Sequence, residues 1–118
     1  MSYQSLWWLI QKYFNHNFLC TVIGIIRDDQ DRLLMLEHTY RSDPLALPSG
    51  FLKKGETPFE ALQREVKEET NFDITPIRII DVISSDGRSH LEFHIAAKYT
   101  GGIFIPSKEV CSFQWVNE

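Results

Sequence analysis

Three glutamates near the middle of the sequence have the spacing of a shared helical face. Glu65, Glu68 and Glu69 occupy positions i, i+3 and i+4, which lie side by side on an α-helix. Like charges at this spacing repel each other by a few tenths of a kcal/mol per pair, so the cluster calls for an explanation. Two explanations fit these residues: a solvated acidic face, or a site at which carboxylate oxygens bind a divalent cation such as Mg²⁺.

The sequence also marks both ends of the helix that carries these carboxylates. Thr57 suits the N-cap, Pro58 suits the first helical position, and Glu60 completes a capping box three residues after the cap. Asn71 follows the last turn and tolerates the left-handed conformation that ends many helices. The pattern predicts a helix over residues 57–70 and assigns Glu60 to capping instead of to the site.

The residues around this helix fit a longer pattern. Six positions, separated by five, seven, zero, two and zero residues, are Gly50, Glu56, Arg64, Glu65, Glu68 and Glu69. A chance match to six such positions has a frequency on the order of 10⁻⁷ per register, which argues against a solvated face alone. With apolar Val66 and Phe72, the segment resembles the signature box of the Nudix hydrolases, here at residues 50–72.

Two positions depart from the usual pattern of that family. Asn71 stands where the family usually has glycine, and Ser49 stands where a second glycine is common, within Leu47-Pro48-Ser49-Gly50. Because asparagine adopts the left-handed conformation at modest cost, we expect the end of the helix to form. The substitution Asn71→Gly is expected to be neutral or stabilising.

The resemblance to Nudix hydrolases implies an activity and a cofactor. It implies hydrolysis of the pyrophosphate linkage of a nucleoside diphosphate derivative or nucleotide, by water attack on phosphorus with bound Mg²⁺ or Mn²⁺. One alternative is a Nudix-like nucleotide-binding or regulatory module without turnover. Another is a housecleaning hydrolase that acts on damaged nucleoside triphosphates. The intact glutamates favour turnover, because a protein that only binds nucleotide is free to lose them.

The resemblance also implies roles for individual residues. The expected metal ligands are Glu65, Glu69, Glu68 and the backbone carbonyl of Gly50, with Glu68 alternatively the base that deprotonates water. Glu56 and Arg64 are expected to form an ion pair that holds the loop against the helix. The expected catalytic group is Glu68, Glu69, Arg64 and Glu56.

Four residues outside the box also have suitable chemistry. Glu109 precedes the last predicted strand, in a region from which several family members supply a glutamate, and is a possible general base. Glu92 is a second possible base within a strand, and for both acids the alternative is a solvated surface position. Arg41 suits contact with a phosphate and Tyr40 suits stacking on a base, although Tyr40 fits the core equally well.

Composition narrows the possible partners. The 118 residues include 12 basic and 16 acidic side chains, so the chain is a poor candidate for binding a nucleic-acid backbone. The excess of four acidic side chains over basic ones equals the number of glutamates in the box, which are Glu56, Glu65, Glu68 and Glu69. Cys20 and Cys111 lack zinc-ligand spacing and indicate half-buried free thiols in a cytoplasmic protein. No apolar run reaches the roughly 20 residues that span a bilayer, and no membrane partner is expected.

The rest of the chain predicts a single domain over residues 1–118. Apolar and β-branched segments predict strands at 18–27, 33–37, 77–83, 91–99 and 110–116, with a loop over 39–48. The pattern indicates an α/β (α+β) domain. The resemblance implies a Nudix-like α/β/α sandwich with a mixed β-sheet, and no C-terminal helix is expected here after the last strand.

An amphipathic helix is predicted at the N-terminal end. Leu6, Leu9 and Ile10 have helical spacing within residues 3–14. Lys12 is the only Lys or Arg there, which argues against a helix bound to a membrane surface. We expect this helix to cover an apolar layer of the sheet, or to form a homodimer by contacting a second subunit.

Overall fold

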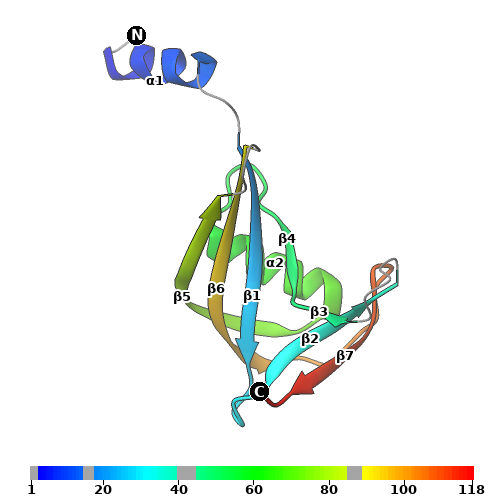
Figure 1. The fold of residues 1–118 in the computed structure, drawn as a ribbon. Coiled ribbons are helices and arrows are strands. Elements are labelled where there is room, and N and C mark those ends of the chain that lie inside the picture. The colour runs from blue at the N-terminus through cyan, green and yellow to red at the C-terminus, as the bar shows by residue number, and fades with distance from the viewer. Residues whose placement is uncertain (1–2, 15–17, 40–44, 85–88) are drawn as a thin grey trace.

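A computed structural model describes residues 3–14, 18–39, 45–84 and 89–118. The elements are α1 (Tyr3–Phe14), β1 (Leu19–Arg27), β2 (Leu33–His38), β3 (Leu45–Ala46), β4 (Ser49–Phe51), α2 (Pro58–Thr70), β5 (Asp73–Ser84), β6 (His90–Gly101) and β7 (Val110–Val116). Figure 1 shows the strands in one twisted sheet, with α2 lying against one face and α1 standing apart from both.

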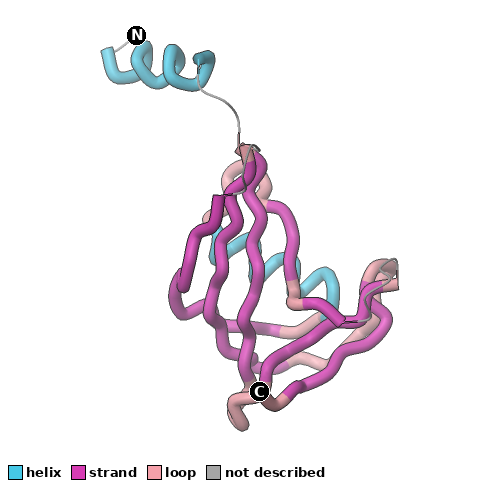
Figure 2. Tube along the Cα trace, in the orientation of Figure 1, coloured by secondary structure: helices cyan, strands magenta, loops and turns pink. Residues whose placement is uncertain are grey.

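The sheet has seven strands and is mixed, as predicted. Five strands follow the order β3-β2-β1-β6-β5, while β4 pairs with β1 and β7 pairs with β2. Strands β1 and β6 are parallel, with Leu19 opposite His90 and Arg27 opposite Lys98. Every other described strand pair is antiparallel, and Figure 2 traces the strands of the sheet in magenta. Strand β1 is central to the sheet because it pairs with β2, β4 and β6.

Helix α2 begins and ends as its sequence predicts. The Thr57 hydroxyl accepts a hydrogen bond from the Glu60 N–H at 3.2 Å, and the Glu60 carboxylate accepts one from the Thr57 N–H at 3.1 Å. At the other end Asn71 has a φ of 68°, and its N–H donates to the Lys67 carbonyl at 2.9 Å. These two caps satisfy backbone groups that a helix end otherwise leaves without partners.

The apolar side of α2 packs on the sheet and fixes the position of the helix. Leu62 and Val66 are buried, and Gly24 of β1 leaves room for Leu62, since a Cβ there would lie 2.9 Å from Leu62 Cδ1. Just beyond the helix, Phe72 is buried beside four aromatic rings, with centroid distances of 4.9–6.4 Å within the group; they are Tyr99, Phe104, Phe113 and Trp115. Such rings stabilise the fold mainly by the apolar area that they bury.

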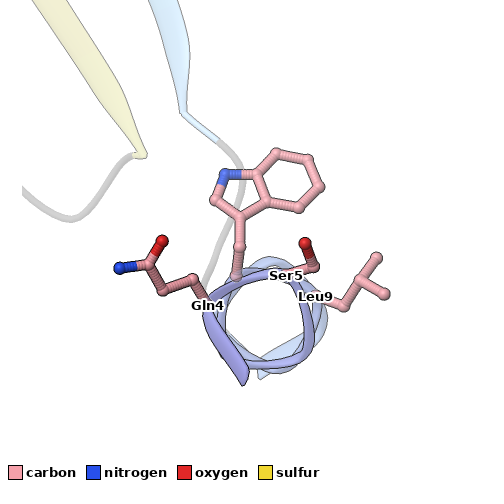
Figure 3. Close-up of a pocket in the computed structure, with 4 residues that line it drawn as sticks. Gln4, Ser5 and Leu9 are labelled. Carbon is pink, nitrogen blue, oxygen red and sulfur yellow. The ribbon is translucent and has the colours of Figure 1, made fainter. Parts of the chain in front are cut away.

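Helix α1 has an apolar surface that the rest of the domain does not cover. Trp7 is 55% exposed and Trp8 is 61% exposed, and the other large apolar residues exposed on the helix are Tyr3, Leu6, Leu9 and Ile10. A hollow of about 440 Å³ is lined by Gln4, Ser5, Trp8 and Leu9, and Figure 3 shows the side chains of Gln4, Ser5 and Leu9 around one turn of the helix. All four belong to one helix, so the hollow is a surface groove. Among the described residues, no helix is long and apolar enough to cross a membrane.

The observed structure differs from the predictions at several points. The predicted loop over 39–48 contains the short strand β3, and its residues 40–44 lie outside the described part of the chain. Strand β5 begins at Asp73, before the predicted residue 77, because an edge strand tolerates Pro76. Cys20 is half-buried as expected, whereas Cys111 is exposed, and both are free thiols.

The left-handed conformation of Asn71 yields a stability prediction. The side chain donates from Nδ2 to the Ile103 carbonyl at 3.0 Å, so Asn71→Gly relieves backbone strain but loses this bond. We expect Asn71→Gly to change the free energy of unfolding by less than about 1 kcal/mol. Asn71→Ala keeps the strain and loses the bond, so it should be less stable by about 1–2 kcal/mol. Urea denaturation tests the order, and equal stability of the two variants would contradict it.

Candidate metal and active site

The loop before α2 is tied to the helix by one guanidinium group. Arg64 donates to both carboxylate oxygens of Glu56, from Nε at 2.6 Å and from Nη2 at 3.1 Å. Its Nη2 also donates to the Phe51 carbonyl at 2.9 Å. The structure therefore contains the expected ion pair between Glu56 and Arg64, in the bidentate geometry that only arginine provides.

The same guanidinium also contacts two of the clustered glutamates. Arg64 Nη1 lies 2.9 Å from Glu65 Oε1 and 3.3 Å from Glu68 Oε2. One cation therefore offsets part of the repulsion that the sequence pattern predicts for this face. The side-chain hydrogen bonds to Glu56, followed by the bond to Glu65, raise the pKa of Arg64 further above its usual range.

Gly50 has a steric role beside Glu65. A Cβ at Gly50 would overlap the carboxyl group of Glu65, so only glycine allows this side chain to lie directly against the backbone of β4. The box glycine is therefore explained by close approach, since no positive φ is required at this position.

The register of β4 indicates which backbone carbonyl faces away from β1. Gly24 donates to the Pro48 carbonyl and Leu52 donates to the Cys20 carbonyl, both at 2.8 Å. Hydrogen-bonded and non-bonded residue pairs alternate along an antiparallel ladder. These two bonds belong to the pairs Gly24–Pro48 and Cys20–Leu52, so the pair midway between them, Val22 and Gly50, is also hydrogen-bonded. The neighbouring carbonyl of Ser49 consequently points away from β1. It therefore suits an added ligand better than the expected carbonyl of Gly50.

Glu69 has surroundings unlike those of its two neighbours. Its side chain is 5% exposed, whereas that of Glu68 is 55% exposed. The Nε2 atom of His38, which is itself 3% exposed at the end of β2, lies 3.7 Å from Glu69 Oε2. The three glutamates therefore share a helix but differ in exposure and contacts.

Two clefts adjoin at these glutamates, because both are lined by Glu65, Glu68 and Glu109. The larger has a volume of about 380 Å³ and its other lining residues are Thr21, Ser49, Gly50, Phe51, Lys53 and Arg64. The smaller has a volume of about 220 Å³ and its other lining residues are Glu69, Ser107 and Lys108. The structure thus brings Glu109 beside the box glutamates, as a residue outside the box that reaches the site.

Thr39, directly after β2, holds the loop that carries Glu109. The Thr39 N–H donates to the Glu109 carbonyl at 2.9 Å, and the Thr39 hydroxyl donates to the Lys108 carbonyl at 2.9 Å. Within the loop, Ser107 N–H donates to the Val110 carbonyl at 2.9 Å. These bonds hold the backbone at Glu109 in place while its side chain lines the cleft.

Other predicted residues do not join this group. Glu92 lies on β6 with Oε1 at 2.7 Å from His94 Nε2, and it is not among the residues that line the two clefts. Tyr40 and Arg41 lie outside the described residues. Thr21, Ser49 and Lys108 also line the clefts, but no local motif marks them in the sequence, because long-range strand pairing brings them there.

No complete metal cage is formed by the described residues: no three of their His, Cys, Asp or Glu side chains gather closely enough to hold an ion. Instead, Arg64 bridges Glu65 and Glu68. The oxygen donors around the clefts are nevertheless of the kind that hard divalent cations prefer.

A family model described as NUDIX domain matches residues 18–118, which is most of the chain. This chain belongs to the Nudix family. The Nudix chain is 35% identical over 98 residues to the 8-oxo-dGDP phosphatase NUDT18 of Mus musculus, which covers 81% of the chain and 30% of that protein. It is 31% identical over 99 residues to the NAD-capped RNA hydrolase NudC of Vibrio atlanticus (strain LGP32), and the match covers 83% of this chain and 36% of that protein. The chain spans about a third of the length of these curated relatives.

Solved structures show the same Nudix fold. A NUDIX hydrolase from Nitrosomonas europaea aligns with a TM-score of 0.78 and 23% identity, covering 88% of this chain and 60% of that one. A UDP-X diphosphatase aligns with a TM-score of 0.75 and 20% identity, covering 98% and 59%. These likenesses confirm the α+β architecture of the Nudix chain.

The Glu56–Arg64 pair yields a pH prediction. The hydrogen bonds from Arg64, helped by the Lys53 N–H and opposed by partial burial, hold the pKa of Glu56 below its ordinary value. A lowered pKa in the folded state stabilises the fold above the unfolded pKa of about 4.3, and this contribution disappears as pH falls through the folded pKa. Glu56→Gln should therefore destabilise the protein at about pH 6 and much less at about pH 3. Urea denaturation at both values tests this, and an equal loss at both would contradict it.

Proposed function

We propose that this Nudix chain is a Mg²⁺-dependent pyrophosphohydrolase, with Mn²⁺ as an alternative cofactor. Its substrate would be a nucleoside diphosphate derivative or nucleotide, cleaved by water attack on phosphorus. The observation that carries this proposal is the pair of adjoining clefts that share Glu65, Glu68 and Glu109. An anionic substrate beside three carboxylates requires a cation between them, which fits a metal-dependent reaction.

The residues suit a hard divalent cation in both donor type and charge. Glu65, Glu68 and Glu69 would hold it through carboxylate oxygens, with the Ser49 carbonyl as a backbone ligand in place of Gly50. The absence of a Cβ at Gly50 supports this assignment, because it lets the Glu65 carboxylate lie against the strand that carries this carbonyl. When bound, the metal supplies charge neutralisation at the phosphate oxygens and lowers the pKa of a water.

The chain's own residues divide the remaining work. Glu68, which is more than half exposed, or Glu109, on the facing loop, would accept the proton from the attacking water. Lys53 and Lys108, which each line one cleft, would attract the phosphates. Arg64 would act as a positioning residue, because its hydrogen bonds join the loop at Glu56 to the glutamates of α2.

The names of the relatives indicate which substrates to test first. One relative is named for 8-oxo-dGDP and another for NAD-capped RNA, and both names denote pyrophosphate-linked nucleotides. We propose a small nucleotide as substrate and expect no sequence-independent contact with nucleic acid. The second name nevertheless places a capped RNA end among the compounds to test.

Turnover on a substrate panel tests the proposed function. The panel contains 8-oxo-dGDP, NAD, UDP-sugars, 8-oxo-dGTP and NAD-capped RNA, and phosphate or mononucleotide release is measured with Mg²⁺. We expect Glu69→Gln to lower kcat by at least about 100-fold on the active compound, because a ligand carboxylate is lost. The control Glu92→Gln, outside both clefts, should keep the wild-type rate. Metal-dependent nucleotide binding without turnover would instead identify a binding module.

We also propose that α1 contacts a second copy of the chain, in a cytoplasmic homodimer. The support is the apolar exposure of α1, whose 12 residues are too few to be a stable helix alone in water. Sedimentation equilibrium should show a dimer, and the double variant Trp7→Ser with Trp8→Ser should shift it towards monomer. A wild-type chain that stays monomeric across the measured concentrations would refute this part.

A further inference from the structure

The buried carboxylate of Glu69 needs a local group to hold it. Burial of an ionised carboxylate costs several kcal/mol unless polar groups compensate it. The Arg64 guanidinium contacts the other two glutamates of this face, Glu65 and Glu68. Glu69 lies one residue further along α2, and the contact seen there comes from His38 on β2.

His38 and Glu69 face each other inside the protein. Their side chains are 3% and 5% exposed, and Nε2 of His38 lies 3.7 Å from Oε2 of Glu69. This separation is longer than a hydrogen bond, and at this depth the electrostatic interaction between the imidazole and the carboxylate is stronger than it would be in water. The contact joins α2 to the far end of a strand, so it restrains the direction of the Glu69 side chain as well as its charge.

An irregularity in the sheet supports the position of His38. On the β2–β7 ladder Glu37 pairs with Ser112 but His38 pairs with Val110, so Cys111 is the extra residue of a β-bulge. Bulges re-aim neighbouring side chains and are frequent beside active sites. This bulge lies opposite the step from Glu37 to His38 and two residues after Glu109, which lines the smaller cleft.

We infer that His38 is a positioning residue that holds the Glu69 carboxylate in the direction required for a metal ligand. The inference rests on the proposed function, since it concerns the same site. It extends that function by assigning a role to a residue outside the Nudix box. Supporting residues that orient metal ligands typically contribute 10–100-fold to metal affinity.

Mn²⁺ binding to the metal-free protein, followed by electron paramagnetic resonance, tests the inference without any substrate. His38→Leu should weaken Mn²⁺ binding by about 10–100-fold. His38→Gln, which places an amide N–H near the position of Nε2, should restore most of it. The matched control is Glu37→Gln, which lies next to His38 but contacts Ser112; it should bind Mn²⁺ like the wild type.

The same substitution made in the Glu69→Gln variant separates a positioning role of His38 from a general structural role. In Glu69→Gln the ligand carboxylate is gone, so adding His38→Leu should weaken the residual Mn²⁺ binding no further. A loss of equal size in both backgrounds would show that His38 only supports the fold, and would overturn the inference. Unchanged binding in His38→Leu would also overturn it.

The test also needs a folding control and the Mn²⁺ affinity of the wild-type protein. If thermal denaturation shows that His38→Leu does not fold, His38→Asn, which shortens the side chain but keeps it polar, replaces it with the same expected loss. Wild-type protein that binds no Mn²⁺ would refute the metal site of the proposed function itself, and the inference with it. If the wild type binds Mn²⁺ and the His38 variants bind it equally well, the role of His38 is refuted but the proposed metal site is not.

Discussion

The contacts of one guanidinium group organise the candidate site. Arg64 joins the loop at Glu56, the backbone at Phe51 and the carboxylates of Glu65 and Glu68. A helix with three neighbouring glutamates is electrostatically unfavourable, and this cation reduces the cost from within the chain. Because three nitrogens of one planar guanidinium donate to these four residues, the arrangement depends on arginine geometry and not on positive charge alone.

The local part of this arrangement could be predicted from the sequence because its distances along the chain are short. Helical periodicity places Glu65 beside Glu68, and the capping box at Thr57 fixes where the helix begins. The mixed sheet and the ion pair of Arg64 with Glu56 were also predicted correctly. The helix and its caps depend on residues within one short segment, whereas the mixed sheet and the ion pair were expected from the resemblance to the Nudix family.

The rest of the site depends on long-range pairing, which a single sequence does not reveal. Ser49 and Thr21 come together through the β1–β4 register, and His38 at the end of β2 lies near Glu69 of α2 although the two residues are far apart along the chain. Glu109 was expected at the site from the family resemblance, but no motif marks its neighbours Ser107 and Lys108. Strand ends were misplaced for a similar reason, since tolerance of Pro in β5 depends on its edge position.

Because of the β-bulge at Cys111, the number of residues between Ser107 and Ser112 matters as much for the site as the types of those residues. Side chains alternate between the faces of a strand, so a one-residue change in spacing reverses their directions. Between Ser107 and Ser112 the chain makes a hydrogen-bonded turn, presents Glu109 to both clefts and re-enters the sheet opposite His38. An insertion or deletion there would move Glu109 and the partner of His38 together. This segment can therefore change many of its side chains more readily than its number of residues.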